Sequence, residues 1–308
     1  MAKQTFTNLV ELMQKFPDEE TCVAHLKSIR WKDGEFCPHC GHEKIYEFKD
    51  GKTFKCADCR KRFSIRVGTI FEESPLPLQK WFVAIYLITA HKKGISSVQL
   101  AKDIGVTQKT AWFMLHRLRE AASTKAFNRP LRDTVEVDET YIGGKEKNKH
   151  KSKRTKGTQG RSTKTKTAVV GLIEREGDLR AQVVDDTRSK TVKDVIVSNV
   201  VFGSKLITDE FRSYRGLEFI YDHLFVKHRL GEYVKGIAHT NTIENFWSIL
   251  KRGIVGIYHF VSKKHLSRYL DEFTFRFNTR GMSEEERFNY LLANCGGRLA
   301  YDQLIGQT

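Results

Sequence analysis

The chain has 308 residues, of which 40% are hydrophobic, and it carries 53 Lys and Arg against 37 Asp and Glu, a formal net charge of +16. This composition excludes a disordered chain, and the length suggests about two domains. No apolar run is long enough to cross a membrane and no secretory signal opens the chain, so we expect a cytoplasmic protein with no membrane partner. The positive charge favours nucleic acid as partner, the alternative being a surface that only aids solubility.

Residues 1–33 are predicted to form two short helices. Asn8 is a suitable N-cap for the first, and Pro17 suits the opening turn of the second. Cys22 falls on the apolar face of the second helix, which indicates a buried small hydrophobic residue and not a metal ligand.

A zinc ribbon is predicted over residues 34–74. Two Cys-x-x-Cys pairs, fifteen residues apart, frame a hairpin whose turn is the Asp50-Gly51 pair. Four thiolates on two tight turns can form a tetrahedral site, and one structural Zn²⁺ would then supply the folding energy that so small a module lacks. His39 and His42 are alternative ligands, but four cysteines already complete a site; they are Cys37, Cys40, Cys56 and Cys59.

Residues 75–125 show the pattern of a helix-turn-helix. An apolar helix over residues 78–92 precedes a short helix over 96–103, a turn containing Gly105, and a longer helix over 107–121. This geometry presents the start of the last helix to the major groove of DNA. The candidate DNA-binding residues are Gln108, Lys109 and Thr110. The alternative is a helical bundle that touches no DNA.

Beyond the polar connector at residues 123–133 the pattern changes to alternating strands and helices. Strands are predicted at residues 134–142, 167–174, 179–184, 204–209 and 223–226, and helices at 191–201, 241–252, 263–276 and 284–294. This order predicts a mixed α/β domain over residues 134–280 and a helical tail over 281–308. The fold class is therefore α+β multidomain.

The segment 145–166 contains ten Lys or Arg against one Glu. It is too polar and too charged to fold alone, which indicates a flexible basic loop. Such a loop can bind DNA phosphates without sequence preference. Its candidate DNA-binding residues are Lys151, Lys153 and Arg154.

Three acidic residues are candidates for a catalytic metal site. Asp138 lies within the first predicted strand of the α/β domain, Asp209 ends the fourth, and Glu244 lies on a later helix. Converging carboxylates repel one another unless a cation joins them, and hard oxygen ligands suit Mg²⁺ or Mn²⁺. The alternative is that they are solvated surface acids, because other acids lie nearby: Glu136, Glu139, Asp185, Asp186 and Glu210.

Three segments resemble the catalytic blocks of insertion-sequence transposases of the DDE superfamily, in particular the bacterial group allied to the Merlin elements. They are VEVDETY at residues 135–141, TDEFRSY at 208–214 and HTNTIENFWSILK at 239–251. The zinc ribbon and helix-turn-helix in front also fit that group, so the resemblance covers nearly the whole chain. It implies a ribonuclease-H-like fold for the α/β domain.

The resemblance also implies the roles of the site residues. Asp138, Asp209 and Glu244 would bind the metal, two ions in the usual arrangement, and Lys251 would lie near the DNA backbone. Some members of the group carry Asn in place of Glu, so the neighbouring Asn241 and Asn245 are alternatives. Glu244 is favoured because it keeps the interval of thirty-four residues after Asp209 that is typical of the superfamily.

The function so implied is that of a DNA transposase. It would bind terminal inverted repeats, hydrolyse a phosphodiester at each transposon end and join the freed 3′-hydroxyl to target DNA, acting as a homodimer or larger assembly. One rival is a DNA-binding regulator with an inactive transposase-derived domain. The other is a structure-selective nuclease with the same fold and metals.

Overall fold

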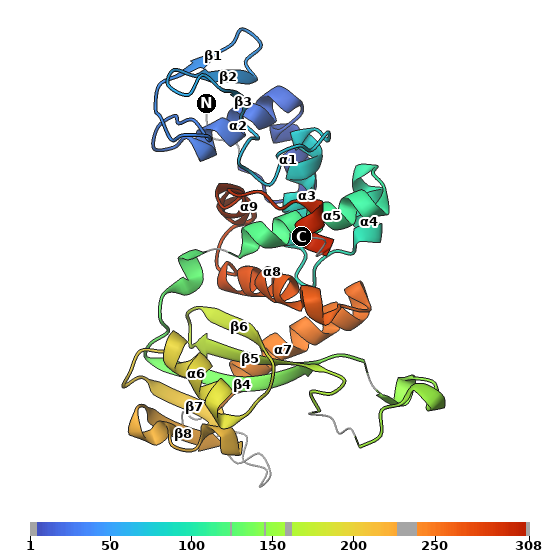
Figure 1. Ribbon diagram of the computed structural model, residues 1–308, viewed down its shortest axis with the longest axis vertical. Coiled ribbons are helices and arrows are strands. Elements are labelled where there is room, and N and C mark those ends of the chain that lie inside the picture. The colour runs from blue at the N-terminus through green and yellow to red at the C-terminus, as the bar shows by residue number, and fades with distance from the viewer. Residues whose placement is uncertain (1–4, 124, 145, 158–161, 227–238, 306–308) are drawn as a thin grey trace. The chain divides into compact units, whose positions relative to one another are not determined.

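The computed structural model describes residues 5–123, 125–144, 146–157, 162–226 and 239–305. The chain divides into two compact units (Figure 1). Unit 1 comprises Met1–Ser123 and Gly281–Thr308, and unit 2 comprises Thr124–Arg280. Within the described ranges, no helix combines the length and the apolar character that a bilayer crossing requires.

Unit 1 begins with two helices, α1 (Leu9–Lys15) and α2 (Glu19–Arg30). The side chain of Asn8 accepts a hydrogen bond from the amide of Glu11 and caps α1, as predicted. The N-cap of α2 is Asp18, so the placement of Pro17 in its opening turn was wrong. An aspartate can accept the free first-turn amides, whereas proline only tolerates that position.

A three-stranded antiparallel sheet follows in unit 1, with the order β1-β2-β3. Its strands are β1 (Ile45–Glu47), β2 (Thr53–Cys56) and β3 (Arg62–Ser64). The carboxylate of Asp50 accepts the amides of Lys52 and Thr53 and closes the predicted turn between β1 and β2. The third strand was not predicted, because three residues carry too short a pattern to be recognised.

Three helices continue unit 1: α3 (Leu78–Ala90), α4 (Ser97–Ile104) and α5 (Gln108–Ala122). Ser96 caps α4 and Thr107 caps α5, each through its side-chain oxygen. Gly105 has φ +62°, a left-handed conformation that turns the chain between the two helices at no steric cost. The two helices and the glycine turn between them therefore lie close to the positions predicted from the sequence.

The C-terminal part of the chain completes the core of unit 1. Its helices are α9 (Glu284–Ala293) and α10 (Tyr301–Ile305). Phe288 of α9 packs edge-on against Phe82 of α3 at 5.2 Å and against Phe6 at 5.4 Å between ring centroids. Residues separated by about two hundred positions in the chain thus share one apolar core, which no local sequence pattern indicated.

Unit 2 is built on a five-stranded mixed sheet with the order β6-β5-β4-β7-β8. β4 pairs antiparallel with β5 and parallel with β7. The strands are β4 (Thr134–Ile142), β5 (Thr167–Glu174), β6 (Leu179–Val184), β7 (Lys205–Asp209) and β8 (Asp222–Val226). Together with the ribbon of unit 1, this mixed sheet and its helices confirm the predicted α+β multidomain fold class.

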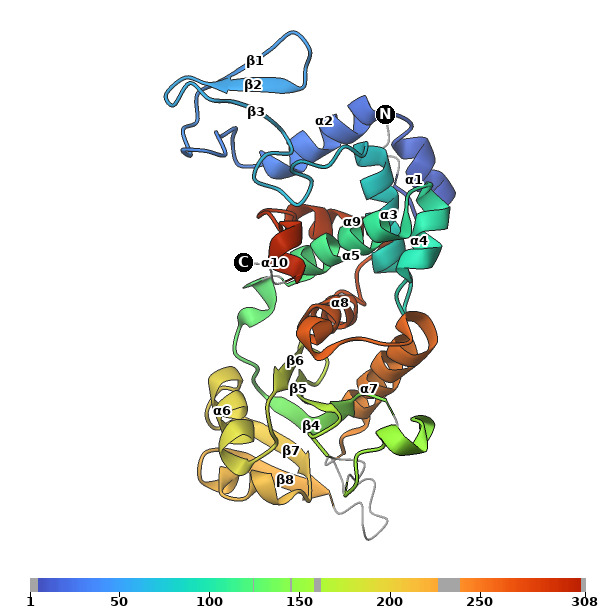
Figure 2. The ribbon, with the colours of Figure 1, turned by 45° about the vertical axis from the view of Figure 1, so that its right-hand side comes forward.

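Helices cover both faces of this sheet (Figure 2). Val192, Val195 and Ile196 of α6 (Ser189–Asn199) pack on one face, over a core that includes Val135 and Val137. The other face is covered by α7 (Asn241–Gly253) and α8 (Leu266–Asn278). Between these two helices lie a π-helical turn (Ile254–Tyr258) and a 3-10 turn (Lys263–His265). Other 3-10 turns are η1 (Lys125–Asn128), η2 (Glu146–Asn148), η3 (Lys151–Lys153), η4 (Arg212–Tyr214) and η5 (Leu217–Phe219).

Candidate active site and metal centre

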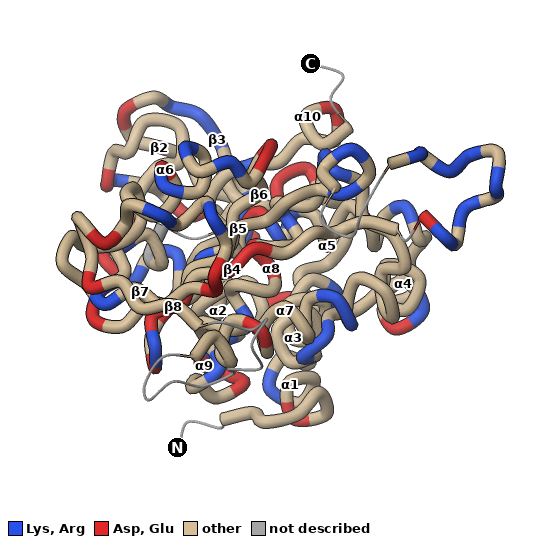
Figure 3. Tube along the Cα trace, turned by 90° about the horizontal axis from the view of Figure 1, so that it is seen from below, with Lys and Arg blue, Asp and Glu red and all other residues tan. Residues whose placement is uncertain are grey.

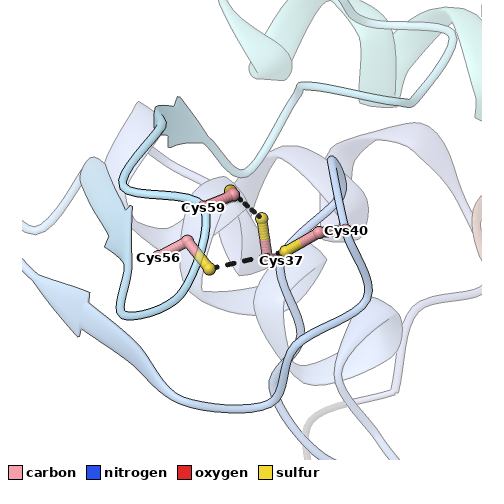
Figure 4. Close-up of side chains that lie close together, drawn as sticks. All are labelled: Cys37, Cys40, Cys56 and Cys59. Atoms are coloured by element: carbon pink, nitrogen blue, oxygen red, sulfur yellow. Dashed lines mark hydrogen bonds between the residues drawn. The ribbon is translucent and has the colours of Figure 1, made fainter.

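The four cysteines of the ribbon lie together, as predicted (Figure 4). Their sulfur atoms lie within 4.8 Å of one another. The Cys37 and Cys59 Sγ atoms are 3.7 Å apart, and the Cys40 and Cys56 Sγ atoms 3.6 Å. Four thiol sulfurs at these separations fit one tetrahedral Zn²⁺, which prefers thiolate ligands in structural sites. His39 and His42 do not belong to this group of ligand atoms.

The apolar core of the ribbon is small. The buried part of its sheet comprises Phe54 and Phe63, whose rings are 5.6 Å apart and nearly parallel. Trp31, just after α2, packs edge-on against Phe54. A core of a few aromatic rings contributes little against the entropy of ordering the loops, and a Zn²⁺ held by the four thiolates would supply the folding energy that this module lacks.

The three candidate carboxylates of unit 2 line one cavity of about 1250 Å³. β4 pairs with β7 so that Glu136 lies opposite Ile207, and Asp138 and Asp209 each follow this pair by two residues. Glu244 reaches the cavity from the first turn of α7. The side chains that the sequence separates by up to 106 positions therefore meet at the end of the parallel strand pair.

The electrostatics of the cavity show that these acids are close neighbours. Burial, together with the negative charges of Asp209 and Glu244, raises the pKa of Asp138 to about 7. Hydrogen bonds orient two of the carboxylates: Asp209 accepts the amide of Phe211 at 2.8 Å, and Glu244 accepts the hydroxyl of Thr240 at 2.8 Å. Mutually repelling, oriented carboxylates in an open cavity are a donor set that fits Mg²⁺ or Mn²⁺, ions that also retain water ligands.

Asp138 is oriented by a tryptophan. The indole N–H of Trp247, on α7, donates to Asp138 Oδ2 at 3.1 Å. Gly171 of β5 lies opposite Asp138 in the sheet, and a Cβ atom there would meet Cη2 of the Trp247 ring at 2.6 Å. The glycine therefore provides the space in which the indole reaches the carboxylate.

Lys251 lies on the same helix as Glu244, two turns further along. Burial lowers the pKa of its ammonium group, with a contribution from Lys166, while the Asp138 carboxylate acts in the opposite direction. Lys251 is thus within electrostatic range of Asp138, although it is not one of the residues that line the cavity.

The candidate DNA-binding residues of unit 1 lie at the start of α5. Gln108 is exposed, and its side-chain amide donates to the hydroxyl of Ser97 at 2.9 Å. Lys109 is exposed, and its ammonium group lies 5.0 Å from the centre of the Tyr301 ring. Thr110 is half-buried and bonds to the capping hydroxyl of Thr107. Gln108 and Lys109 are thus the more accessible of the three.

The described parts of the basic loop, residues 146–157 and 162–166, carry eight Lys or Arg and one Glu. Figure 3 shows the charged residues along the chain. Lys151, Lys153 and Arg154 are exposed. The guanidinium of Arg154 donates to the carbonyl oxygens of Lys147 and Lys149, which closes the turn on itself.

Other residues at the cavity were not assigned from the sequence. Arg212, Arg215 and His223 also line it. Glu136, interpreted above only as a neighbouring acid, is fully buried and contacts the start of α7. The two arginines follow Asp209 closely in the chain, and this proximity was the one available signal for them. Nothing in the sequence pointed to His223 or to the partners of Glu136.

A cysteine-rich ribbon in one unit and an acidic cavity on a mixed sheet in the other define a zinc-ribbon enzyme of the DDE type. Residues 130–278 match the ISXO2-like transposase domain, and residues 17–62 match the transposase zinc-ribbon domain. The chain is 30% identical over 277 residues to an uncharacterized protein in transposable element ISH50 of Halobacterium salinarum, covering 86% of this chain and 92% of that protein. The chain therefore belongs to the transposase family that combines this zinc ribbon with the ISXO2-like transposase domain, and the resemblance to insertion-sequence transposases is confirmed.

Solved structures of the Mos1 transposase are also similar. The match to the Mos1 paired-end complex with the left transposon end covers 71% of this chain and 80% of the Mos1 chain, at 14% identity and a TM-score of 0.30. The match to the pre-cleavage Mos1 transpososome covers 70% of this chain and 79% of the Mos1 chain, at 13% identity and a TM-score of 0.26.

Proposed function

We propose that this transposase binds the terminal inverted repeats of an insertion sequence, hydrolyses a phosphodiester at each end and joins the freed 3′-hydroxyl to target DNA. The observation that carries the proposal is the meeting of Asp138, Asp209 and Glu244 at one cavity with a raised Asp138 pKa. Bringing these three like charges together lowers the stability of the fold, and a purely structural role does not explain why the chain would do so.

Asp138, Asp209 and Glu244 are the proposed metal-binding residues. Divalent ions held there would activate the attacking oxygen and stabilise the leaving oxygen of the phosphodiester. Lys251 is proposed to hold the DNA backbone beside the carboxylates. Arg212 and Arg215, at the rim of the same cavity, add two cations that suit phosphate oxygens.

DNA recognition is divided between two regions in this proposal. Gln108, Lys109 and Thr110 at the start of α5 would read base edges of the repeats, with help from the ribbon. The basic loop, through Lys151 and its neighbours, would bind phosphates without sequence preference and lose affinity steeply as salt rises. Because two transposon ends must be held together, we infer a homodimer or a larger assembly.

The test is a strand-transfer assay in vitro with Mg²⁺ or Mn²⁺ and the element's own ends. Asp138→Asn should abolish both hydrolysis and joining, while binding to the terminal repeats, measured by fluorescence anisotropy, stays close to wild type. Joining of ends by the Asn variant would show that the catalytic assignment is wrong.

The same assay separates the rival functions. A DNA-binding regulator with an inactive catalytic domain would bind the repeats but neither cut nor join them at any metal concentration. A structure-selective nuclease would cut DNA but leave the 3′-hydroxyl unjoined, and would not prefer the inverted repeats. The intact set of three acidic residues at the cavity favours the transposase over the regulator.

A further inference from the structure

Glu136 lies on β4 two residues before Asp138, so both side chains emerge on the sheet face that α7 covers. Its side chain is 0% exposed. An ionised carboxylate at such a position is costly unless other groups satisfy it. The groups that satisfy the Glu136 carboxylate connect β4 with the first turn of α7.

The carboxylate of Glu136 accepts hydrogen bonds from the first turn of α7. The amides of Thr242 and Ile243 donate to its Oε2 atom at 3.0 and 3.1 Å, and the Thr242 hydroxyl donates to Oε1 at 3.0 Å. On the other side, Arg175 Nε donates to Oε1 at 2.9 Å and neutralises the charge. Arg175 also donates to the carbonyl of His239, just before the helix.

This arrangement replaces a local N-cap. Most other described helices with a side-chain cap use the residue that precedes them, as with Ser96 before α4 and Ser283 before α9. The N-cap residue of α7, Thr240, makes no side-chain capping bond, and its hydroxyl donates to Glu244. The amides of α7 that a cap would normally satisfy are satisfied by a strand residue 106 positions earlier.

The next residue after these capped amides is Glu244. A carboxylate bonded to two successive amides fixes both the axial position of the helix and its rotation. One turn later, Trp247 of the same helix donates to Asp138. Glu136 therefore lies where it can set the distance between the candidate metal ligand on α7 and the one on β4.

We propose that Glu136 is a positioning residue of the transposase active site: by capping α7 from β4, it places Glu244 against Asp138 and Asp209 for metal binding. This inference rests on the proposed function. Groups that orient metal ligands from behind typically change metal affinity or activity by about 10- to 100-fold when they are removed.

The experiment measures Mn²⁺ binding by the full chain, by electron paramagnetic resonance, in the absence of DNA. Glu136→Ala should weaken binding by about 10- to 100-fold, and Glu136→Gln, which keeps one acceptor oxygen, by less. The matched control is Glu174→Gln and Glu174→Ala on β5. Glu174 is 8% exposed and is bonded to Arg129, but none of its hydrogen bonds reaches α7. The Glu174 variants should bind Mn²⁺ as wild type does.

A second variant keeps the test decisive if Glu136→Ala does not fold. Thr242→Val has the same shape and removes one of the hydrogen bonds to Glu136, so it should weaken Mn²⁺ binding to a smaller extent. Hydrogen exchange adds a readout independent of metal: the amides of Thr242 and Ile243 should exchange faster in the Glu136 variants and not in the Glu174 variants.

The outcomes separate this inference from the proposed function. If Asp138→Asn binds Mn²⁺ as tightly as wild type, the metal site itself is wrong and both proposals fall. If binding depends on Asp138 but the Glu136 variants equal the Glu174 variants, the positioning role alone is overturned. Unchanged amide exchange at the start of α7 would overturn the capping on which that role depends.

Discussion

The ribbon of unit 1 and the acidic cavity of unit 2 are metal sites of opposite construction. All four cysteines lie between residues 37 and 59, and their sulfurs are within 4.8 Å of one another. The three carboxylates come from two strands and a helix, and among the described residues they do not form so close a group. The ribbon site is made by local turns and supplies folding energy. The acidic site is made by the whole fold, which must overcome the repulsion of its ligands.

The largest expected effect lies in the ribbon. Removing zinc with a chelator, or replacing Cys56 by Ser, should unfold the region around β1, β2 and β3, because structural zinc contributes about 10–16 kcal/mol of apparent binding free energy. Hydrogen exchange should show lost protection there and unchanged protection in the sheet of unit 2. Cys22→Ala is the control, since Cys22 is equally buried but lies outside the cluster. Retained protection in the chelated ribbon would contradict the zinc assignment.

The acidic site should behave in the opposite way. Asp209→Asn removes a charge that repels Asp138, so the metal-free chain should become more stable by about 1 kcal/mol while strand transfer is lost. Thermal unfolding without metal, paired with the joining assay, measures both. Glu210→Gln is the control, because Glu210 lines the same cavity but is not a proposed ligand. A destabilised Asp209→Asn variant would mean that the carboxylates do not repel one another in the folded chain.

An effect of intermediate size concerns the support of Asp138. Trp247→Phe keeps most of the ring but removes the N–H donor, and we expect activity to fall by about 10-fold with little change in stability. Gly171→Ala should push the indole away and also destabilise unit 2 by about 1–3 kcal/mol through overpacking. The joining assay and thermal unfolding separate the two variants. Wild-type activity in Trp247→Phe would show that the indole only fills space.

The sequence predicted best what depends on local patterns. The strands at residues 134–142, 167–174 and 179–184 have the predicted bounds, because long apolar or alternating runs identify a sheet strand clearly. The four-cysteine cluster was predicted for the same reason: its ligands and spacing are contained in one short segment. The three-residue strand β3 and the π-helical turn carry no such pattern and were missed.

What the sequence could not predict are contacts between distant segments. Glu136 has the same local signature as its acidic neighbours, and nothing nearby in the chain indicates that it accepts amides from α7. Likewise, the pattern of α9 predicts a helix but not that Phe288 enters the core with Phe82. The three acidic residues at the cavity were identified through family blocks, since their spacing alone could not distinguish them from other acids.

The variant with the smallest expected effect, Asn245→Ala, decides the third ligand when it is compared with Glu244→Gln. Glu244 lines the cavity, whereas Asn241 and Asn245 do not appear among its lining residues. Asn245 is exposed and lies about 100° further around α7 than Glu244, so Asn245→Ala should leave strand transfer near the wild-type rate. Glu244→Gln, which keeps the size but removes the charge, should abolish it, because a neutral amide is a poorer ligand for Mg²⁺.

The pair of variants is informative because the two residues are adjacent on one helix turn and differ little in exposure. Damage to α7 would affect both alike, so only a difference between them reports on ligation. Single-turnover joining rates across a Mn²⁺ titration provide the measurement. A variant that only weakens metal binding recovers its joining rate at high Mn²⁺ concentration. A variant that removes an essential charge does not recover it. Should Asn245→Ala fail while Glu244→Gln joins ends, the asparagine would be the third ligand, and α7 would present a different side to the cavity during catalysis.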